Sequence, residues 1–571
     1  MPEPTSYDYI VVGAGSAGAV VASRLSESGA YRVLLLEAGT EGSDFFWSRL
    51  PVGVSKMIDD PAVNWCYRSE PDEGSGGRQI DVPRGKMLGG SSSINGMVFI
   101  RGQAQDYDHW AQLGNRGWSY LDVLPIFKRM ERYDGGTDAY RGRSGILRVT
   151  DTPRHQVPLL EMIIEAARNI GLPFNPDQNG ESQEGVGMSQ VTIAKGRRQS
   201  TAYCYLDPAR GRKNLLIEQG ALAESLILEG KRCVGVRYAV NGVPREARAS
   251  REVIVSGGAI NSPKLLELSG IGQPELLRSH GITPLHELRG VGENLRDHYS
   301  PRVKFAISKR NLTFNDNARG WRLAREALKY ALFGNGFLAS TTVPVRMYFR
   351  TREGLETPDA VVSIAPLLYE MVKRERRIAK RQGITMNINV LRSESTGSIH
   401  IKSKNPADAP AIRFNFLSTE HDRIGLLAAI RKGRELMATS PLKEITDRAG
   451  HQAAERRGAA RLGAKKCRDH VSSRRHLQDG LRCAGRSRSR TAGAGYRRPA
   501  RRRCLHHADV DLGQHQRALD HDRRKMRGNG ADRRYGEREG GIEASICARS
   551  RAERELAPDR LMEARRPPEN R

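Results

Sequence analysis

A strand, a glycine-rich turn and a helix follow one another near the start of the chain, and this order constrains the fold most strongly. Residues 7–12, YDYIVV, end in β-branched and apolar side chains, as a short buried strand does. The turn GAGSAG occupies residues 13–18, and a helix-forming run begins at residue 19. A strand that enters a helix through G-x-G-x-x-G is typical of a dinucleotide-binding unit. The pattern predicts an α/β fold with a Rossmann-like domain.

The glycines and one acid of this unit have separate predicted roles. Gly13 permits the tight turn, Gly15 lets the backbone approach a pyrophosphate, and Gly18 lets helix and strand pack closely. Ser16 lies at the entry to the helix, whose free N–H groups can bind phosphates. A second short strand leads into Glu37, whose carboxylate can accept hydrogen bonds from ribose hydroxyls. These five residues predict a dinucleotide site, without separating FAD from NAD.

Longer motifs further along the chain are more specific. Residues 83–102, PRGKMLGGSSSINGMVFIRG, and 258–272, GAINSPKLLELSGIG, resemble the two signature motifs of the glucose–methanol–choline (GMC) oxidoreductase family. The runs GVGENLRDH at 290–298 and GSIHI at 397–401 are also family-like. The chain looks most like bacterial choline and alcohol dehydrogenases. The resemblance implies FAD as the cofactor and oxidation of an alcohol to an aldehyde by hydride transfer to flavin N5.

The resemblance also implies cofactor contacts in the first motif and in a later strand. In the family the first motif lies along the flavin, and the later strand pairs its backbone with adenine. Ala223 stands in that strand where the family usually has Val. Some relatives attach the flavin through a histidine at the position of Ile94, so noncovalent FAD is expected here. The cofactor contacts implied by these segments are Met87, Gly90, Asn95, Gly96, Met97, Val98 and Ala223.

The expected architecture is a Rossmann-like FAD-binding domain interleaved with a substrate-binding domain that contains a mainly antiparallel sheet. The FAD-binding domain is assigned to residues 7–300, with 151–190 contributing to the substrate side, and the substrate-binding domain to 301–440. In the second motif, Ser262-Pro263 is predicted to start a helix as N-cap and first residue. The alternating run around Pro344 is predicted to be a strand, and the proline indicates an edge strand.

Composition changes sharply near the C-terminus. Residues 451–571 carry +16 of the chain's net charge of +28, and their aromatic side chains are Tyr496 and Tyr535 alone. A nucleic-acid-binding arm would require stacking aromatics, so nucleic acid is not expected as a partner. Cys504 and the histidines at 506–507 lack further ligands at regular spacing, so no metal site is predicted. The remaining cysteines are scattered, and no secretory signal or bilayer-spanning run is found. We therefore expect a cytoplasmic protein, at most peripheral to the inner membrane.

The family's catalytic stretches are absent from this tail in the frame as written. In the family, a histidine in T-x-H-P-x-G-T-C-K-M-G accepts the hydroxyl proton, and an asparagine or histidine in G-N-T-N-A-P assists. When the codons are read one base out of register, those of residues 465–480 admit KNAATTFHPVGTCKMG and those of 513–527 admit GNTNAPSTMTAEKC. We infer a one-base change of frame between 441 and 455. Residues 441–571 are then an aberrant tail, expected to be disordered.

The chain as written is therefore predicted to contain no catalytic residue. His109, His280 and His298 are assigned to packing or surface roles, because a lone histidine usually has one. Three functions stay open. The first is an FAD-dependent oxidoreductase that acts on a small alcohol and passes electrons to a quinone, an electron-transfer protein or oxygen. The second is an inactive flavin-binding remnant, and the third is a basic-tailed nucleic-acid-binding protein.

Overall fold

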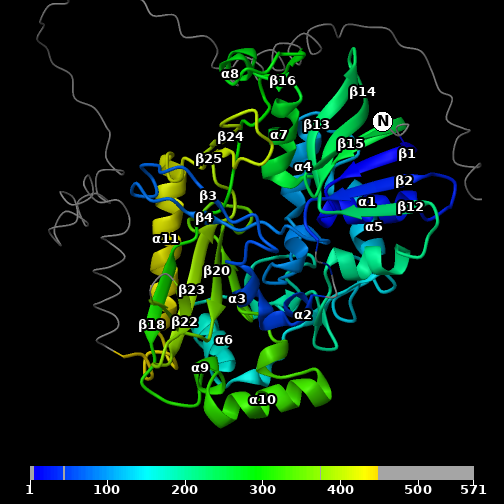
Figure 1. Cartoon of the computed structure of the whole chain (residues 1–571). Coiled ribbons are helices and arrows are strands. Elements are labelled where there is room, and N and C mark those ends of the chain that lie inside the picture. Colours follow the sequence, from blue (N-terminus) through cyan, green and yellow to red (C-terminus); the bar gives the residue numbers. More distant parts are fainter. Residues whose placement is uncertain (1–4, 41, 43–44, 373–374, 448–571) are drawn as a thin grey trace, which may run out of the picture. The chain divides into compact units, whose positions relative to one another are not determined.

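Two separate sheets organise the part of the chain that the computed structural model describes, residues 5–40, 42, 45–372 and 375–447 (Figure 1). The first sheet has six strands. In spatial order they are β12 (Leu215–Gln219), β2 (Val33–Glu37), β1 (Thr5–Val12), β15 (Val243–Val255), β14 (Arg232–Val240) and β13 (Ala221–Glu229). β12, β2, β1 and β15 are parallel, whereas β13, β14 and β15 form an antiparallel meander. Helix α1 (Ser16–Leu25) connects β1 to β2.

The second sheet has five antiparallel strands. In spatial order they are β18 (Arg302–Ala306), β23 (Gly383–Val390), β20 (Ala360–Ala365), β19 (Val345–Phe349) and β8 (Gly185–Met188). Helices α6 (Leu159–Asn169) and α11 (Glu420–Met437) pack their apolar faces against it, and the largest hydrophobic cluster lies there. The described chain stays packed to its end, because Leu442 and Ile445 are buried in the same cluster.

The remaining α-helices and two-stranded pairs lie outside these two sheets. The helices are α2 (Phe46–Arg49), α3 (Val54–Met57), α4 (Ala104–Gln112), α5 (Tyr120–Met130), α7 (Gly258–Leu268), α8 (Pro274–Ser279), α9 (Phe314–Asn317) and α10 (Gly320–Phe333). The two-stranded pairs are β3 (Tyr67–Arg68) with β4 (Asp81–Val82), β5 (Glu131–Arg132) with β6 (Leu147–Arg148), β7 (Thr150–Asp151) with β9 (Gln190–Val191), β10 (Ile193–Ala194) with β11 (Arg197–Arg198), β16 (Ile271–Gly272) with β17 (His286–Glu287), β21 (Tyr369–Val372) with β22 (Glu375–Ile378), and β24 (Ser398–His400) with β25 (Ala411–Arg413).

The two sheets share the chain in alternation, as the sequence predicts. β8 comes between β1 and β12 in the sequence, yet it pairs with β19 of the five-stranded sheet. Both sheets have cores of their own, and β2 is buried at all five positions. The predicted α/β fold, with a Rossmann-like domain interleaved with a mainly antiparallel domain, is confirmed.

Two local predictions are wrong. Helix α7 does not start at Ser262-Pro263 but one turn earlier, with Gly257 as its N-cap and Pro263 inside the helix. A proline removes only one N–H donor from the ladder, and the helix continues through this one. Strand β19 is not an edge strand, because it lies between β20 and β8. Pro344 precedes its first residue, and its carbonyl accepts a hydrogen bond from Ser189 N at 2.8 Å.

Candidate functional site

A cavity of about 530 Å³ lies at the carboxyl ends of the parallel strands of the six-stranded sheet. The last residues of β1, β2 and β15 line it, which is where open α/β sheets bind ligands. The first glycine turn, the first motif and the start of β13 all contribute. The predicted cofactor residues that line the cavity are Gly13, Gly15, Ser16, Glu37, Gly90 and Ala223. The structure thus brings three segments that are far apart in the sequence around one space.

The glycines of this cavity allow backbone to approach backbone. Gly13 has a φ of +96°, and a Cβ there would lie 2.7 Å from Ser256 O. A Cβ on Gly90 would lie 2.7 Å from the Cα of Gly15. Gly15 differs, because a Cβ on it would meet nothing closer than 4.0 Å. Its missing side chain leaves space at the N-terminus of α1, where free N–H groups can bind phosphate oxygens.

Glu37 places a buried carboxyl group at the end of β2, in the cavity wall. Its Oε2 accepts a hydrogen bond from Ala14 N and its Oε1 one from Gly39 N, each at 2.9 Å. Burial raises the pKa of this carboxyl to about 7, although both backbone N–H groups and Lys86 oppose the rise. The remaining lone pairs can accept hydroxyl hydrogens of a ribose. Together with the glycine-lined space, this carboxyl makes the cavity fit the adenosine and pyrophosphate part of a dinucleotide.

The other predicted cofactor residues do not line this cavity. Gly18 lies beneath it, and a Cβ there would come within 1.9 Å of Gly13 O. Met87 is fully buried, in an apolar cluster that includes Ile94. Met97 is buried with Val191 and Ile193. The residues outside the lining are Gly18, Met87, Asn95, Gly96, Met97 and Val98.

Sequence reasoning missed a second wall of the cavity, made by the start of α7 and the side chain of Lys264. The Lys264 Nζ donates hydrogen bonds to the carbonyl oxygens of Pro406 and Asp408, both at 2.7 Å. Burial lowers the pKa of this amine to about 8. A signal was available, since Gly257-Gly258 follows a strand as the first glycine turn does.

The segment from Asn95 to Arg101 is fixed by hydrogen bonds from distant residues. Phe99 N donates to Gln190 O at 2.8 Å, and Asn179 Nδ2 donates to Phe99 O at 3.2 Å. Arg101 N donates to Asn179 Oδ1 at 2.6 Å. These contacts fix Phe99 and Arg101, which follow the segment Asn95–Val98 that the sequence predicts to face the flavin.

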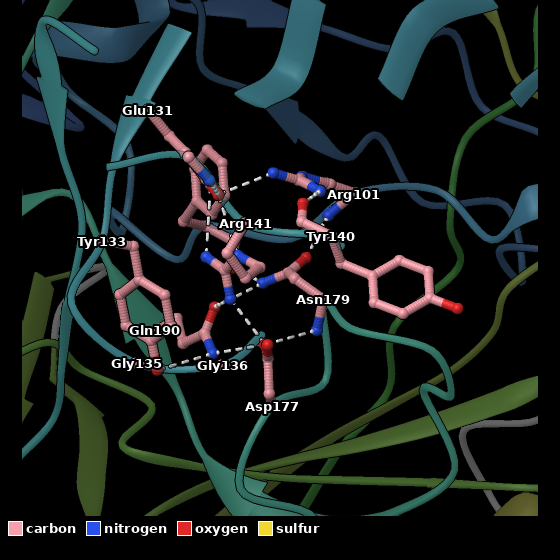
Figure 2. A network of polar contacts seen from close by, with 12 residues as sticks. Arg101, Glu131, Tyr133, Gly135, Gly136, Tyr140, Arg141, Asp177, Asn179 and Gln190 are labelled. Atoms are coloured by element: carbon pink, nitrogen blue, oxygen red, sulfur yellow. Dashed lines mark hydrogen bonds and ion pairs between the residues drawn. The ribbon is translucent and has the colours of Figure 1, made fainter. Parts of the chain in front are cut away.

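An ionic cluster lies behind this segment, and Figure 2 shows Arg141 at its centre. Arg141 Nε lies 2.8 Å from Glu131 Oε1, and its Nη1 lies 2.5 Å from Asp177 Oδ1 and 2.8 Å from Gln190 Oε1. Arg101 Nη2 approaches Glu131 Oε1 to 2.7 Å. The side chains of Arg141 and Glu131 are completely buried. A buried charge needs partners of this kind. The cluster therefore fixes the positions of Gln190 and Asn179, which hydrogen-bond to Phe99.

The sequence model of the GMC oxidoreductase family matches residues 7–300 and 393–490 of the chain. The chain belongs to the GMC oxidoreductase family. The cofactor expected from the glycine turn and the first motif is therefore FAD, and the protein is an FAD-dependent oxidoreductase by family.

Relatives of this GMC oxidoreductase include choline dehydrogenases. The oxygen-dependent choline dehydrogenase of Chromohalobacter salexigens is 40% identical over 443 residues, which cover 77% of this chain and 78% of the relative. Among solved structures, pyridoxine 4-oxidase from Mesorbium loti is 26% identical with a TM-score of 0.68, covering 78% of this chain and 85% of that one. A formate oxidase shares the fold with a TM-score of 0.72 at 23% identity, covering 80% and 87%.

Three family-like motifs of this GMC oxidoreductase meet at His400. Its Nδ1 lies 2.7 Å from Glu267 Oε1 in α7, and its Nε2 lies 3.1 Å from Glu293 Oε1 in the 290–298 run. The hydrogen bond with Glu267 raises the pKa of His400 above its ordinary value. None of these three side chains lines the cavity, so the cluster ties the motifs together away from the cofactor space.

The histidines that the sequence assigns to packing or surface also lie outside the cavity lining. His109 is on α4, His280 follows α8, and His298 Nε2 lies 2.9 Å from Leu391 O. Within the described ranges, no group of three or more His, Cys, Asp or Glu side chains is placed to hold a metal ion. Residues 441–447, predicted to begin the aberrant, disordered tail, are instead packed, with Leu442 and Ile445 buried in the core of the second sheet. The rest of the interval predicted for the change of frame, the missing catalytic stretches and Cys504 with its neighbouring histidines lie outside the described residues.

Proposed function

We propose that this protein, once its reading frame near residues 441–455 is restored, oxidises a small, choline-like or short-chain alcohol to an aldehyde with noncovalent FAD. The observation that carries the proposal is the cavity at the strand ends, with Glu37 and the glycine turn in its wall. The choline dehydrogenases among its relatives support an alcohol as the substrate. FAD, when bound, supplies the acceptor for the hydride that leaves the alcohol carbon.

Different residues of the cavity wall bind different parts of the cofactor. Gly13, Gly15 and Ser16 bind the pyrophosphate, because α1 begins there with free N–H groups and no Cβ intervenes at Gly15. Glu37 accepts the ribose hydroxyls. The backbone of Ala223 binds the adenine, and Gly90 lets the first motif pass close to the glycine turn, since a Cβ there would collide with Gly15.

We assign the flavin ring to the segment of Asn95, Gly96, Met97 and Val98. Met97 has a φ of +61°, an uncommon backbone conformation for a residue with a side chain. Buried Arg198 fixes the start of the segment, because its Nη1 donates to Asn95 O at 2.7 Å and to Asn95 Oδ1 at 2.8 Å. Gly18 and Met87 act by packing beneath the site.

Ile94 supports noncovalent attachment. Its aliphatic side chain offers no nucleophile, and it is buried in an apolar cluster with Met87.

A proton acceptor for the alcohol hydroxyl is needed as well as the cofactor. We propose that the codons downstream of residues 441–455 encode it in another frame. The two family stretches recovered by one constant offset support this. The C-terminal family match extends to residue 490, past the proposed change of frame. Sequencing of the gene across codons 441–455 therefore tests whether the frame changes there. One base more or fewer than the present sequence is the expected result.

The test compares two full-length proteins, the chain as written and the chain with the frame restored. Both are reconstituted with FAD, and reduction of an artificial dye is followed with choline and with short primary alcohols. We expect both to bind FAD and only the restored chain to turn over, which makes the chain as written a flavin-binding remnant. Alcohol-dependent dye reduction by the chain as written would contradict the proposed role of the lost stretches.

The electron acceptor is a separate assignment. Oxygen, a quinone and an electron-transfer protein are the candidates, and hydrogen peroxide formation by the restored enzyme distinguishes the first from the others.

A further inference from the structure

Helix α10 presents an apolar face to solvent. It lies along the lower edge of the described chain in Figure 1, after β18 and α9 in the sequence. Large apolar side chains on a helix of a soluble domain usually face a core. Four on this helix are instead more than half exposed, namely Trp321 at 68%, Leu328 at 60%, Leu332 at 65% and Phe333 at 70%.

Three of these side chains share one side of the helix. Trp321, Leu328 and Leu332 are separated by seven and four residues, which is the spacing of one α-helical face. The helix is anchored from its other side. Glu326 accepts a hydrogen bond from Phe337 N at 2.9 Å, and the Tyr330 hydroxyl donates to Gly196 O at 3.1 Å. The apolar face is thus held outward by a fixed helix.

The charges around this face have one sign. Residues 309–335 contain six Lys and Arg residues, and their only acids are Asp316 and Glu326. Both acids turn inward. Glu326 is buried, and Asp316 accepts hydrogen bonds from Asn311 N at 3.0 Å and Gln382 Nε2 at 2.9 Å. Arg325 and Lys329, in contrast, are exposed on α10. An exposed apolar face therefore lies beside exposed cations, with no exposed acid within residues 309–335. Arg325 also pairs with the buried Glu326, its Nη2 lying 3.6 Å from Glu326 Oε1.

We propose that α10 docks this protein on the surface of an anionic lipid bilayer. A basic amphipathic helix with Trp, Leu and Phe on its apolar face lies in the plane of such a surface, with the apolar side chains among the acyl chains. The 14 residues of α10 are too few to span a bilayer, which takes roughly 20. Across the described ranges, none of the helices combines the length and apolarity of a membrane span. The proposal does not depend on the proposed alcohol oxidation.

Charge argues against two other partners for this face, namely a second copy of the chain and the chain's own C-terminal residues. In a two-fold contact between copies, α10 would meet the same cations on its partner, and like charges would oppose each other. The C-terminal residues 451–571 carry a net charge of +16, so they do not complement the helix either. An anionic bilayer attracts the cations and takes up the apolar side chains.

The test measures co-sedimentation of the FAD-reconstituted full chain with vesicles of phosphatidylcholine, alone or mixed with phosphatidylglycerol. We expect binding to the mixed vesicles. The variant Trp321→Ser/Leu328→Ser/Leu332→Ser should weaken it at least ~10-fold, because three apolar side chains are lost from the contact. The variant Arg325→Gln/Lys329→Gln should weaken it about 25-fold, at roughly fivefold for each cation near the surface. Leu121→Ser is the matched control, since Leu121 on α5 is 79% exposed, and it should bind like the unchanged protein.

The basic C-terminal residues can also attract anionic lipid, so a second readout reports on α10 itself. Brominated lipid acyl chains in the mixed vesicles should quench the fluorescence of Trp321, and the quenching should be largely lost in Trp321→Phe. Equal quenching in both proteins, or equal vesicle binding by the triple serine variant, would overturn the proposal. So would failure of the unchanged protein to bind. A concentration-dependent dimer that the triple variant abolishes, without vesicle binding, would assign the face to a second copy instead and overturn it too.

Discussion

The Nδ1 atom of His400 lies 2.7 Å from Oε1 of the fully buried Glu267, across 133 residues of chain. Glu293 faces the other ring nitrogen at 3.1 Å. A protonated imidazole satisfies both carboxylates at once, which is why its pKa is raised.

The stability of the protein should therefore depend on pH through His400. The folded pKa is raised above the ordinary value of 6.5, so the stabilisation is fully present below 6.5 and is lost as the pH rises through the folded pKa. Each unit of the rise contributes about 1.4 kcal/mol. Urea unfolding between about pH 6 and pH 9 should show a falling free energy of unfolding, and His400→Gln should flatten the curve. Identical pH profiles for the two proteins would show that His400 is not charged in this cluster.

The buried ionic cluster predicts a large effect for one substitution. Arg141→Met leaves Glu131 and Asp177 without their main cation, and removing one partner of a buried pair costs about 3–5 kcal/mol. Arg289→Met is the control, because its ion pairs with Glu275 and Glu287 are exposed to solvent and such pairs contribute little to stability. Chemical denaturation measures both. If Arg141→Met lowers the free energy of unfolding as little as Arg289→Met does, the cluster does not stabilise the fold.

The glycine turn predicts two different consequences for two alanines. Gly15→Ala should fold normally, because its Cβ meets nothing closer than 4.0 Å, but it should weaken FAD binding at least ~10-fold by filling the approach to the pyrophosphate. Gly18→Ala should fail to fold, because its Cβ would come within 1.9 Å of Gly13 O. Circular dichroism reports folding, and fluorescence titration reports FAD affinity. Unchanged affinity in Gly15→Ala would place the pyrophosphate elsewhere.

Glu37 predicts that FAD affinity falls as the pH drops below about 7, since its carboxyl has a pKa of about 7. The ionised form accepts ribose hydroxyl hydrogens more strongly than the protonated form does. The loss should reach at most ~10-fold per pH unit. Titrations of FAD at several pH values measure it, with Glu37→Gln as the comparison. The variant should bind more weakly at neutral pH and show no such pH dependence.

Local sequence patterns predicted much of the fold, and half of the predicted cofactor residues line one cavity. The strand, glycine turn and helix of residues 7–25 are encoded by neighbouring residues, and the structure places Gly13, Gly15 and Glu37 around one cavity. Whether β19 is an edge strand depends instead on its pairing with β8, which no local pattern contains. For that reason the edge strand predicted from Pro344 was wrong.

Contacts between distant segments could not be predicted either, because no local pattern in the sequence contains them. Arg141 meets Glu131, Asp177 and Gln190 from 10, 36 and 49 residues away, without any periodic signal. The wall of the cavity at Lys264 depends likewise on the loop of Pro406, which lies 142 residues further on.

Binding of FAD by the full chain tests the central claim most directly. The purified protein is incubated with FAD, separated from free flavin by gel filtration, and its flavin absorbance is compared with its protein absorbance. The account predicts stoichiometric flavin that co-elutes with the protein and is released on denaturation, and a marked loss of it in Gly15→Ala. Protein that elutes without flavin, or a cavity that binds NAD in preference to FAD, would contradict it.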